Sequence, residues 1–233
     1  MSAIRTVNSD VVAERAAALQ DLPILTFRLP GQWWQIPLSD ERAARAAIGA
    51  LVDTQVGSAD NQATLRRDLK SRMLAALDSA IAGDGQSMQI ALTIVPETPM
   101  SASLLVFLPN VFLTPAIGTA PSAVMDVLRL GLETATDIST MVRFATSDSE
   151  ILRLNRVTHA ATVVEQAAAA FAASADAEKN RIPALMVDYW MTVPGFKRAV
   201  LVSFSTVYAD LEEVMLTLFD SIIRASYWRW PVK

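Results

Sequence analysis

Hydrophobic residues recur with helical spacing in three parts of the chain. From about 40 to 55 and from 60 to 83, apolar side chains repeat every three or four residues, which indicates amphipathic helices. The same spacing returns between 211 and 223 and predicts a helix with one buried face. Ser39, followed by two acidic residues, suits the start of the first helix, and Asp60 is the expected N-cap of the second.

A period of two predicts strands arranged as hairpins. The first hairpin spans 87–108 around the turn "PETPM", the second pairs "STMVRFAT" with "EILRLNRVTHA", and the third joins "ALMVDYWMTV" to "RAVLVSFST". Between the first two hairpins, Ser122 is expected to cap a helix that continues to about Thr134. This order contains few parallel βαβ units, so the sequence predicts an α+β fold in which helices flank an antiparallel sheet.

The chain contains no clean linker, and we expect residues 1–233 to form a single α+β domain. Two segments add to it, namely an N-terminal helical extension over about 1–22 and an alanine-rich insertion over about 160–180. Alanine favours a helix. The insertion is poor in large apolar side chains, however, and a mobile connection is the alternative.

Composition narrows the class of protein. With 52% hydrophobic and 19% charged residues, the chain has enough apolar material for a folded core. The net charge is −4 and the longest basic run is the pair Arg66-Arg67, which argues against a nucleic-acid partner. The absence of cysteine excludes disulfides, thiolate catalysis and zinc–cysteine sites. There is no secretory h-region and no apolar run of the roughly 18 residues that span a bilayer, so we expect a cytoplasmic protein without a membrane span.

Candidate catalytic groups are few. His159 is the only histidine, so a catalytic triad or a histidine-based metal site would have to use it, and we expect an ordinary strand histidine instead. Asp148 and Glu150 lie near a predicted turn, and Asp188 interrupts an apolar strand at a position expected to face solvent. The segment "GDGQS" lacks the Lys-Ser/Thr of a phosphate-binding loop and is expected to end a helix. We therefore expect no enzymatic activity, no cofactor and no metal site.

Tryptophans are the first candidates for a binding surface. Trp33 and Trp34 are adjacent in "LPGQWWQIPLSDE", so on a strand their rings point to opposite faces. By the same rule Trp228 and Trp230 share a face, with Arg229 opposite. Such rings either fill the core or, with arginine, anchor a partner protein.

The proline-rich loop "PNVFLTPAIGTAPS" is the second candidate. It carries Val111, Phe112, Leu113 and Ile117, which would form an exposed apolar patch unless other residues cover them. Exposed apolar patches usually mark a binding site. Packing of the loop over an edge of the sheet is the alternative.

Three motifs resemble a known superfamily. "WWQIPLSDE", "VDYWMTVPGFKRAVLVSFST" and "LFDSIIRASYWRW" resemble uncharacterised actinobacterial proteins that look like members of the Mog1/PsbP-like superfamily. The likeness covers about the first and last thirds of the chain. It implies an α/β/α sandwich that opens with a Trp-containing strand and closes with an amphipathic helix and a short Trp strand. It also implies a non-enzymatic accessory role. Relatives include a GTPase-binding factor and a photosystem subunit, and some actinobacterial examples look associated with specialised secretion.

The sequence as a whole predicts a cytoplasmic protein-interaction module, an accessory or chaperone-like factor of a secretion or assembly system. The candidate partner surface comprises Trp33, Trp34, Val111, Phe112, Leu113, Ile117, Trp228, Arg229 and Trp230. Two alternatives stay open. One is a structural subunit that self-associates through the 110–120 loop, and the other is a small-ligand carrier with a groove between sheet and helices.

Overall fold

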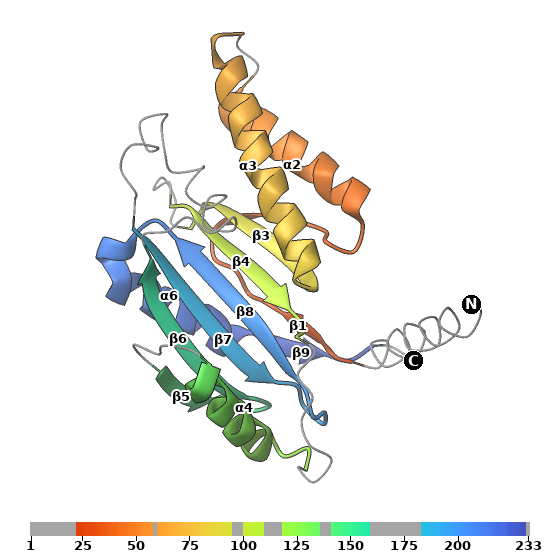
Figure 1. The fold of residues 1–233 in the computed structure, drawn as a ribbon, viewed down its shortest axis with the longest axis vertical. Coiled ribbons are helices and arrows are strands. Elements are labelled where there is room, and N and C mark those ends of the chain that lie inside the picture. The colour runs from red at the N-terminus through yellow and green to blue at the C-terminus, as the bar shows by residue number, and fades with distance from the viewer. Residues whose placement is uncertain are drawn as a thin grey trace, which may run out of the picture.

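A seven-stranded antiparallel sheet forms the centre of the molecule (Figure 1). The computed structural model describes residues 22–57, 60–94, 100–109, 118–135, 141–158 and 183–231. In spatial order the strands are β2 (Gln32–Ile36), β3 (Gly85–Thr93), β4 (Ala102–Phe107), β8 (Ala199–Thr206), β7 (Ala184–Thr192), β6 (Glu150–Thr158) and β5 (Met141–Ala145). The predicted α+β class is confirmed, and so are the three hairpins, which are the antiparallel pairs β3–β4, β5–β6 and β7–β8.

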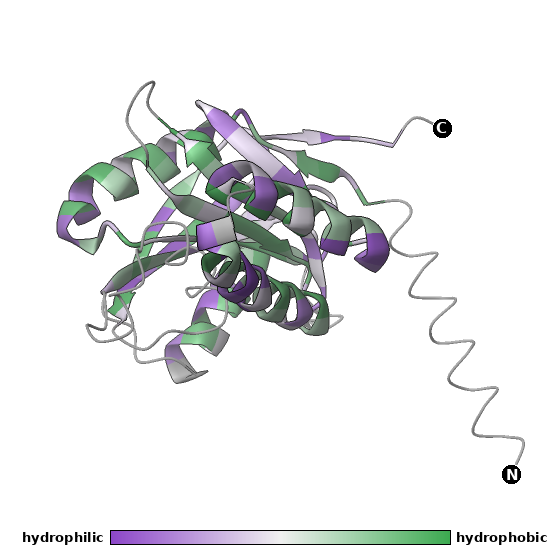
Figure 2. Ribbon diagram, turned by 90° about the horizontal axis from the view of Figure 1, so that it is seen from above, coloured by the Kyte–Doolittle hydropathy of each residue, from purple (hydrophilic) through white to green (hydrophobic). Residues whose placement is uncertain are grey.

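Helices lie on both sides of this sheet (Figure 2). On one face, α2 (Glu41–Val56) and α3 (Ala63–Ala82) bury an apolar cluster against β2, β3 and β4, and α4 (Pro121–Ala135) buries another against β6. On the opposite face, α6 (Glu212–Ala225) buries Met215, Phe219, Ile222 and Ile223. We call this second side of the sheet the α6 face. The three layers give the predicted arrangement of helix, sheet and helix.

Three expected helix starts are wrong by one to three residues. The N-cap of α2 is Asp40, whose carboxylate accepts a hydrogen bond from the Ala43 amide at 3.0 Å, and Ser39 lies outside the helix. Asp60 begins a 3-10 turn, and α3 starts only at residue 63. Ser122 is the second residue of α4, because Pro121 takes the first helical position, where its fixed φ and missing N–H cost nothing.

Aromatic rings and one carboxylate hold α6 against the sheet. The Phe204 and Phe219 rings stack with centroids 4.4 Å apart, and Tyr189 meets Phe204 edge to face. Asp220 accepts hydrogen bonds from the Tyr189 hydroxyl at 2.7 Å and from Arg153 Nη1 at 2.6 Å. Burial, reinforced by the bond to Asp220, raises the pKa of Tyr189 far above its usual range, so the hydroxyl stays a donor.

A second, two-stranded sheet joins the two ends of the described chain. Strand β1 (Ile24–Thr26) pairs antiparallel with β9 (Tyr227–Arg229), and Leu25 lies opposite Trp228. Both of these side chains pack against the apolar core of the α6 face. The short Trp strand after α6 was predicted, whereas β1 was not. We call this pair of strands the β1–β9 ribbon.

Several expectations concern residues that the structure does not describe. These are the N-terminal extension up to residue 21, the alanine-rich segment 160–180 and His159. Within the described ranges, no helix combines the length and the apolar character needed to cross a membrane.

Candidate functional site

The β1–β9 ribbon is fixed to the main sheet by a short chain of hydrogen bonds. The Trp228 indole Nε1 donates to Ser149 Oγ at 2.8 Å, and Ser149 Oγ donates to the Thr192 carbonyl at 2.7 Å. Ser149 is buried in the turn between β5 and β6. This chain ties β9 to the ends of two central strands, so the ribbon is held at a defined place on the α6 face.

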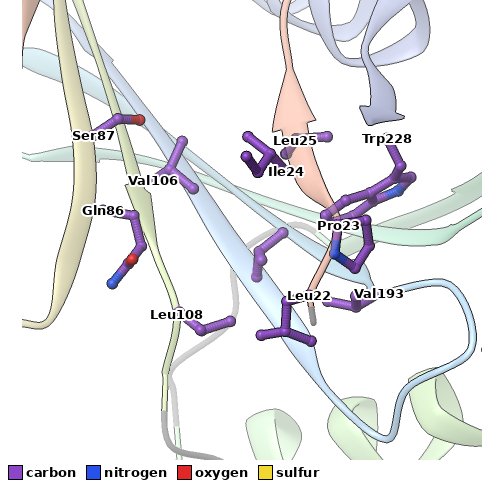
Figure 3. A pocket seen from close by; sticks show the side chains of 11 residues that line it. Leu22, Pro23, Ile24, Leu25, Gln86, Ser87, Val106, Leu108, Val193 and Trp228 are labelled. Atoms are coloured by element: carbon purple, nitrogen blue, oxygen red, sulfur yellow. The ribbon is translucent and has the colours of Figure 1, made fainter. Parts of the chain in front are cut away.

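A groove separates the ribbon from the neighbouring strands of the sheet. It consists of two adjoining cavities of about 280 and 440 Å³, which share Ile24, Leu25 and Ser87 as lining residues. Figure 3 shows the first cavity, with β1 and Trp228 on one side and Ser87, Gln86 and Val106 of β3 and β4 on the other. We call the two cavities together the groove.

One end of the groove is aliphatic and aromatic. Apart from the shared residues it is lined mainly by Leu22, Pro23, Val106, Leu108, Val193, Val200 and Trp228. Transfer of an apolar side chain of a ligand into such a space is favourable because it removes hydrocarbon from water. This end can therefore accept apolar side chains or a short hydrocarbon chain.

The other end is mixed, because it carries amide and hydroxyl groups beside the apolar side chains of Phe27, Leu29 and Trp33. Gln35 on β2 and Gln89 on β3 are cross-strand partners on the α6 face, and Ser87 follows on the same side of β3. Within the described part of the chain, these three side chains make no hydrogen bond. An amide side chain offers both donors and an acceptor. This end of the groove can thus form hydrogen bonds with a bound molecule.

The charge of the groove is positive. Arg229 is the charged residue among the described residues that line it, and none of these is Asp or Glu. The Arg229 side chain forms no ion pair or hydrogen bond within the ranges that the structure describes. In a chain with a net charge of −4, this places an unpaired cation beside a half-apolar groove.

The adjacent tryptophans face opposite sides of β2, as predicted. Trp33 packs against the core of the α6 face and lines the polar end of the groove, where its indole N–H is already used by the Pro30 carbonyl at 2.7 Å. Trp34 packs against the cluster under α2 and α3. Both rings are half-buried, and only Trp33 belongs to the groove.

The structure places the three candidate residues 228–230 in different positions. Trp228 lines the apolar end and Arg229 the polar end of the groove. Trp230 lies beyond β9, is 54% exposed and has its ring centroid 6.3 Å from that of Phe196. The structure thus brings Trp33, Trp228 and Arg229 to one groove and leaves Trp34 and Trp230 outside it. The loop candidates Val111, Phe112, Leu113 and Ile117 lie outside the described residues.

Asp188 does not simply face solvent, so that expectation is wrong. Its side chain is only 15% exposed and accepts hydrogen bonds from Ser203 Oγ at 2.6 Å and from Arg156 Nη1 at 2.7 Å. Ser203 is its cross-strand partner on β8, and Arg156 lies on the neighbouring strand β6. A carboxylate on a central strand is thus compensated by polar neighbours on both sides.

The groove residues that sequence reasoning missed are Gln35, Ser87 and Gln89. Each occupies an ordinary polar position in an alternating strand. Their common side becomes apparent only from the pairing of β2 with β3. Among the described residues, no group of three or more His, Cys, Asp or Glu side chains is placed to hold a metal ion.

Comparison with known proteins does not assign this chain to a family. No protein-family model matches the chain, and no curated protein matches it. Among solved structures, that of LpqN, a protein involved in cell envelope biogenesis of Mycobacterium tuberculosis, aligns with 91% of this chain and 86% of its own. The TM-score is 0.37 and the sequence identity 8%, which does not establish a common fold. The Mog1/PsbP-like resemblance of the sequence motifs therefore stays a prediction.

Proposed function

We propose that this protein is a non-enzymatic protein-interaction module whose groove receives a segment of a partner protein. The observation that carries the proposal is that Trp33, Trp228 and Arg229 line one groove although Trp33 and Trp228 are far apart in sequence. Tryptophan and arginine are the residues that most often anchor a protein interface. The unused amides of Gln35 and Gln89 add hydrogen-bonding groups at the same place.

A binding role fits this chemistry better than a catalytic role. General acid–base catalysis needs a titratable group positioned at the reacting atoms. The described lining offers amides, hydroxyls and one arginine, and it contains neither a carboxylate nor a histidine. From the sequence motifs we further propose a Mog1/PsbP-like sandwich that acts in the cytoplasm as an accessory or chaperone-like factor of a secretion or assembly system.

A small-ligand carrier is the second candidate function. It is favoured by the apolar end of the groove, a cavity of about 280 Å³ between β1, β9 and the sheet. This volume is close to the lower limit of the usual small-molecule site of roughly 300–1,000 Å³. Mass spectrometry of denatured protein that releases one stoichiometric small molecule would support the carrier.

Filling the groove is expected to abolish partner capture. Ser87 lines both cavities, so a Ser87→Trp substitution places a large ring where the partner segment would lie. Tagged wild-type protein expressed in the native host is expected to retain a stoichiometric partner protein, and the variant is expected to lose it. Affinity purification followed by proteomics measures the difference.

Two controls accompany this experiment. Ser71→Trp makes the same chemical change at an exposed position on α3, on the far side of the sheet, and should leave capture unchanged. Thermal unfolding of each variant confirms that the protein is folded. Equal capture by wild-type protein and a folded Ser87→Trp variant would exclude the groove as the partner site.

A further inference from the structure

We propose that the partner segment is an extended peptide that carries apolar side chains at one end and an acidic side chain at the other. This inference rests on the proposed function and specifies its ligand. The apolar side chains enter the cavity between the β1–β9 ribbon and the main sheet, and the carboxylate pairs with Arg229. Between them the peptide backbone lies along Gln35, Gln89 and Ser87.

The positive charge beside the groove indicates that the end of the peptide near Arg229 is acidic. In the described part of the chain, the Arg229 guanidinium has no carboxylate partner and no acidic residue lines either cavity. The nearby Arg28 guanidinium lies 5.6 Å from the centroid of the Tyr227 ring, so this side of the ribbon holds a second cation. A guanidinium presents paired donors that match a carboxylate. A basic segment would be repelled here.

The glutamine pair favours a peptide over an acyl chain. Gln35 and Gln89 lie side by side across β2 and β3, and Ser87 is two residues from Gln89 on the same side of the strand. A peptide backbone offers an N–H and a C=O in every residue, which suits side chains that can donate and accept. A hydrocarbon chain over the same row would remove these groups from water without replacing their hydrogen bonds, which is unfavourable.

The different side chains at the two ends of the groove determine which end of the segment is apolar and which is acidic. The apolar end contains Leu22, Val106 and Trp228, whereas Arg229 and both glutamines line only the other end, beside apolar side chains such as Trp33. A peptide with mixed apolar and acidic residues in random order would place a carboxylate in the apolar cavity in many registers. Desolvation of that carboxylate is costly. The groove therefore selects segments in which the apolar side chains and the acidic side chain are separated along the peptide.

Selection from a library of random peptides displayed on phage tests the inference. The full-length wild-type protein is expected to enrich peptides in which an apolar cluster is separated from Asp or Glu. Selection on Arg229→Glu is expected to exchange the acidic residue for Lys or Arg. For a single enriched peptide measured by fluorescence anisotropy, replacing its acid by Gln should weaken binding roughly fivefold, since an exposed ion pair contributes modestly.

The variants separate failure of the inference from failure of the proposed function. One outcome would overturn the acidic specificity and leave the groove as the partner site. In it, the enriched peptides bind wild-type protein but not Ser87→Trp, and they show either no preference for acidic residues or the same preference on Arg229→Glu. If no peptide distinguishes wild-type protein from folded Ser87→Trp, both proposals fail. Displacement of the enriched peptides by a fluorescent fatty acid that Ser87→Trp does not bind would identify an acyl-chain site instead and overturn the inference.

Discussion

Replacing Asp220 with alanine is expected to lower the free energy of unfolding by about 3 kcal/mol or more, because a partly buried charge loses its counter-ion. The Arg153 side chain is 12% exposed and that of Asp220 23%, and the Arg153 Nη1–Asp220 Oδ2 distance is 2.6 Å. Arg153 Nε is already buried without a hydrogen-bond partner. Removing the carboxylate also takes the acceptor from the Tyr189 hydroxyl. The change in stability is measured by urea denaturation followed by circular dichroism.

Milder variants divide this effect into its parts. Asp220→Asn keeps an oxygen acceptor near Tyr189 but removes the charge, and Tyr189→Phe removes only one hydrogen bond, which is worth about 1 kcal/mol. The double variant Arg153→Met/Asp220→Leu removes both charges together and should be more stable than Asp220→Ala, because no unpaired ion remains. Equal stability of wild-type protein and Asp220→Ala would show that the contact of α6 with the sheet does not depend on this carboxylate.

The same cluster predicts the response to alkaline pH. The pKa of Tyr189 is raised in the folded state, first by burial and then by the bond to Asp220, whereas an unfolded tyrosine has a pKa of about 10. The folded state therefore resists a deprotonation that the unfolded state undergoes. The contribution of the neutral Tyr189 hydroxyl to the free energy of unfolding is therefore fully present below about pH 10 and decreases above it. Tyr189→Phe should remove this part of the alkaline dependence.

Gly31→Ala is expected to lower the free energy of unfolding by a similar amount, about 3 kcal/mol, because backbone strain and steric overlap combine. Gly31 has a φ of +77°, and a Cβ atom added there would lie 2.1 Å from the Thr93 carbonyl oxygen and 2.9 Å from Ile94 Cα. These are backbone atoms, so β2 would have to move away from β3. Trp33 and Gln35 would then leave the groove, and partner binding should weaken together with stability.

Two other glycines separate the causes of this loss. Gly195 has nearly the same φ, +78°, but a Cβ added there would meet no atom within 4 Å, so Gly195→Ala should cost only the conformational penalty of about 1–2 kcal/mol. Gly131 lies within α4, where alanine should stabilise by roughly 0.5–1 kcal/mol. The expected order of urea midpoints, from most to least stable, is Gly131→Ala, wild type, Gly195→Ala and Gly31→Ala. A Gly31→Ala midpoint equal to that of Gly195→Ala would mean that the overlap with β3 is relieved at no cost.

The hairpins and the closing helix could be predicted from sequence because their patterns are local. Alternation of apolar and polar residues identifies β7 and β8, and the "PGFK" turn joins them directly. The spacing of Met215, Phe219 and Ile222 likewise identifies the buried side of α6. The opposite orientation of Trp33 and Trp34 needs only strand geometry.

The groove could not be predicted, because it depends on contacts between distant segments. Strand β1 has three residues, too few for a periodic signal, and its partner β9 lies at the other end of the described chain. Without that pairing, the sequence gives no indication that Leu25 and Trp228 lie opposite each other. Asp188 illustrates the same point, since its bonds to Ser203 and Arg156 follow from strand order and not from its own alternating position.

Photo-crosslinking in the native host tests the central claim most directly. A benzophenone amino acid placed at Gln89 reports on the groove, and one placed at Arg67, whose side chain is 77% exposed on α3, reports on the far side of the sheet. If the groove receives the partner, position 89 is expected to give a covalent adduct with one partner protein that is absent from position 67. No adduct at position 89, or the same adducts from both positions, would contradict it.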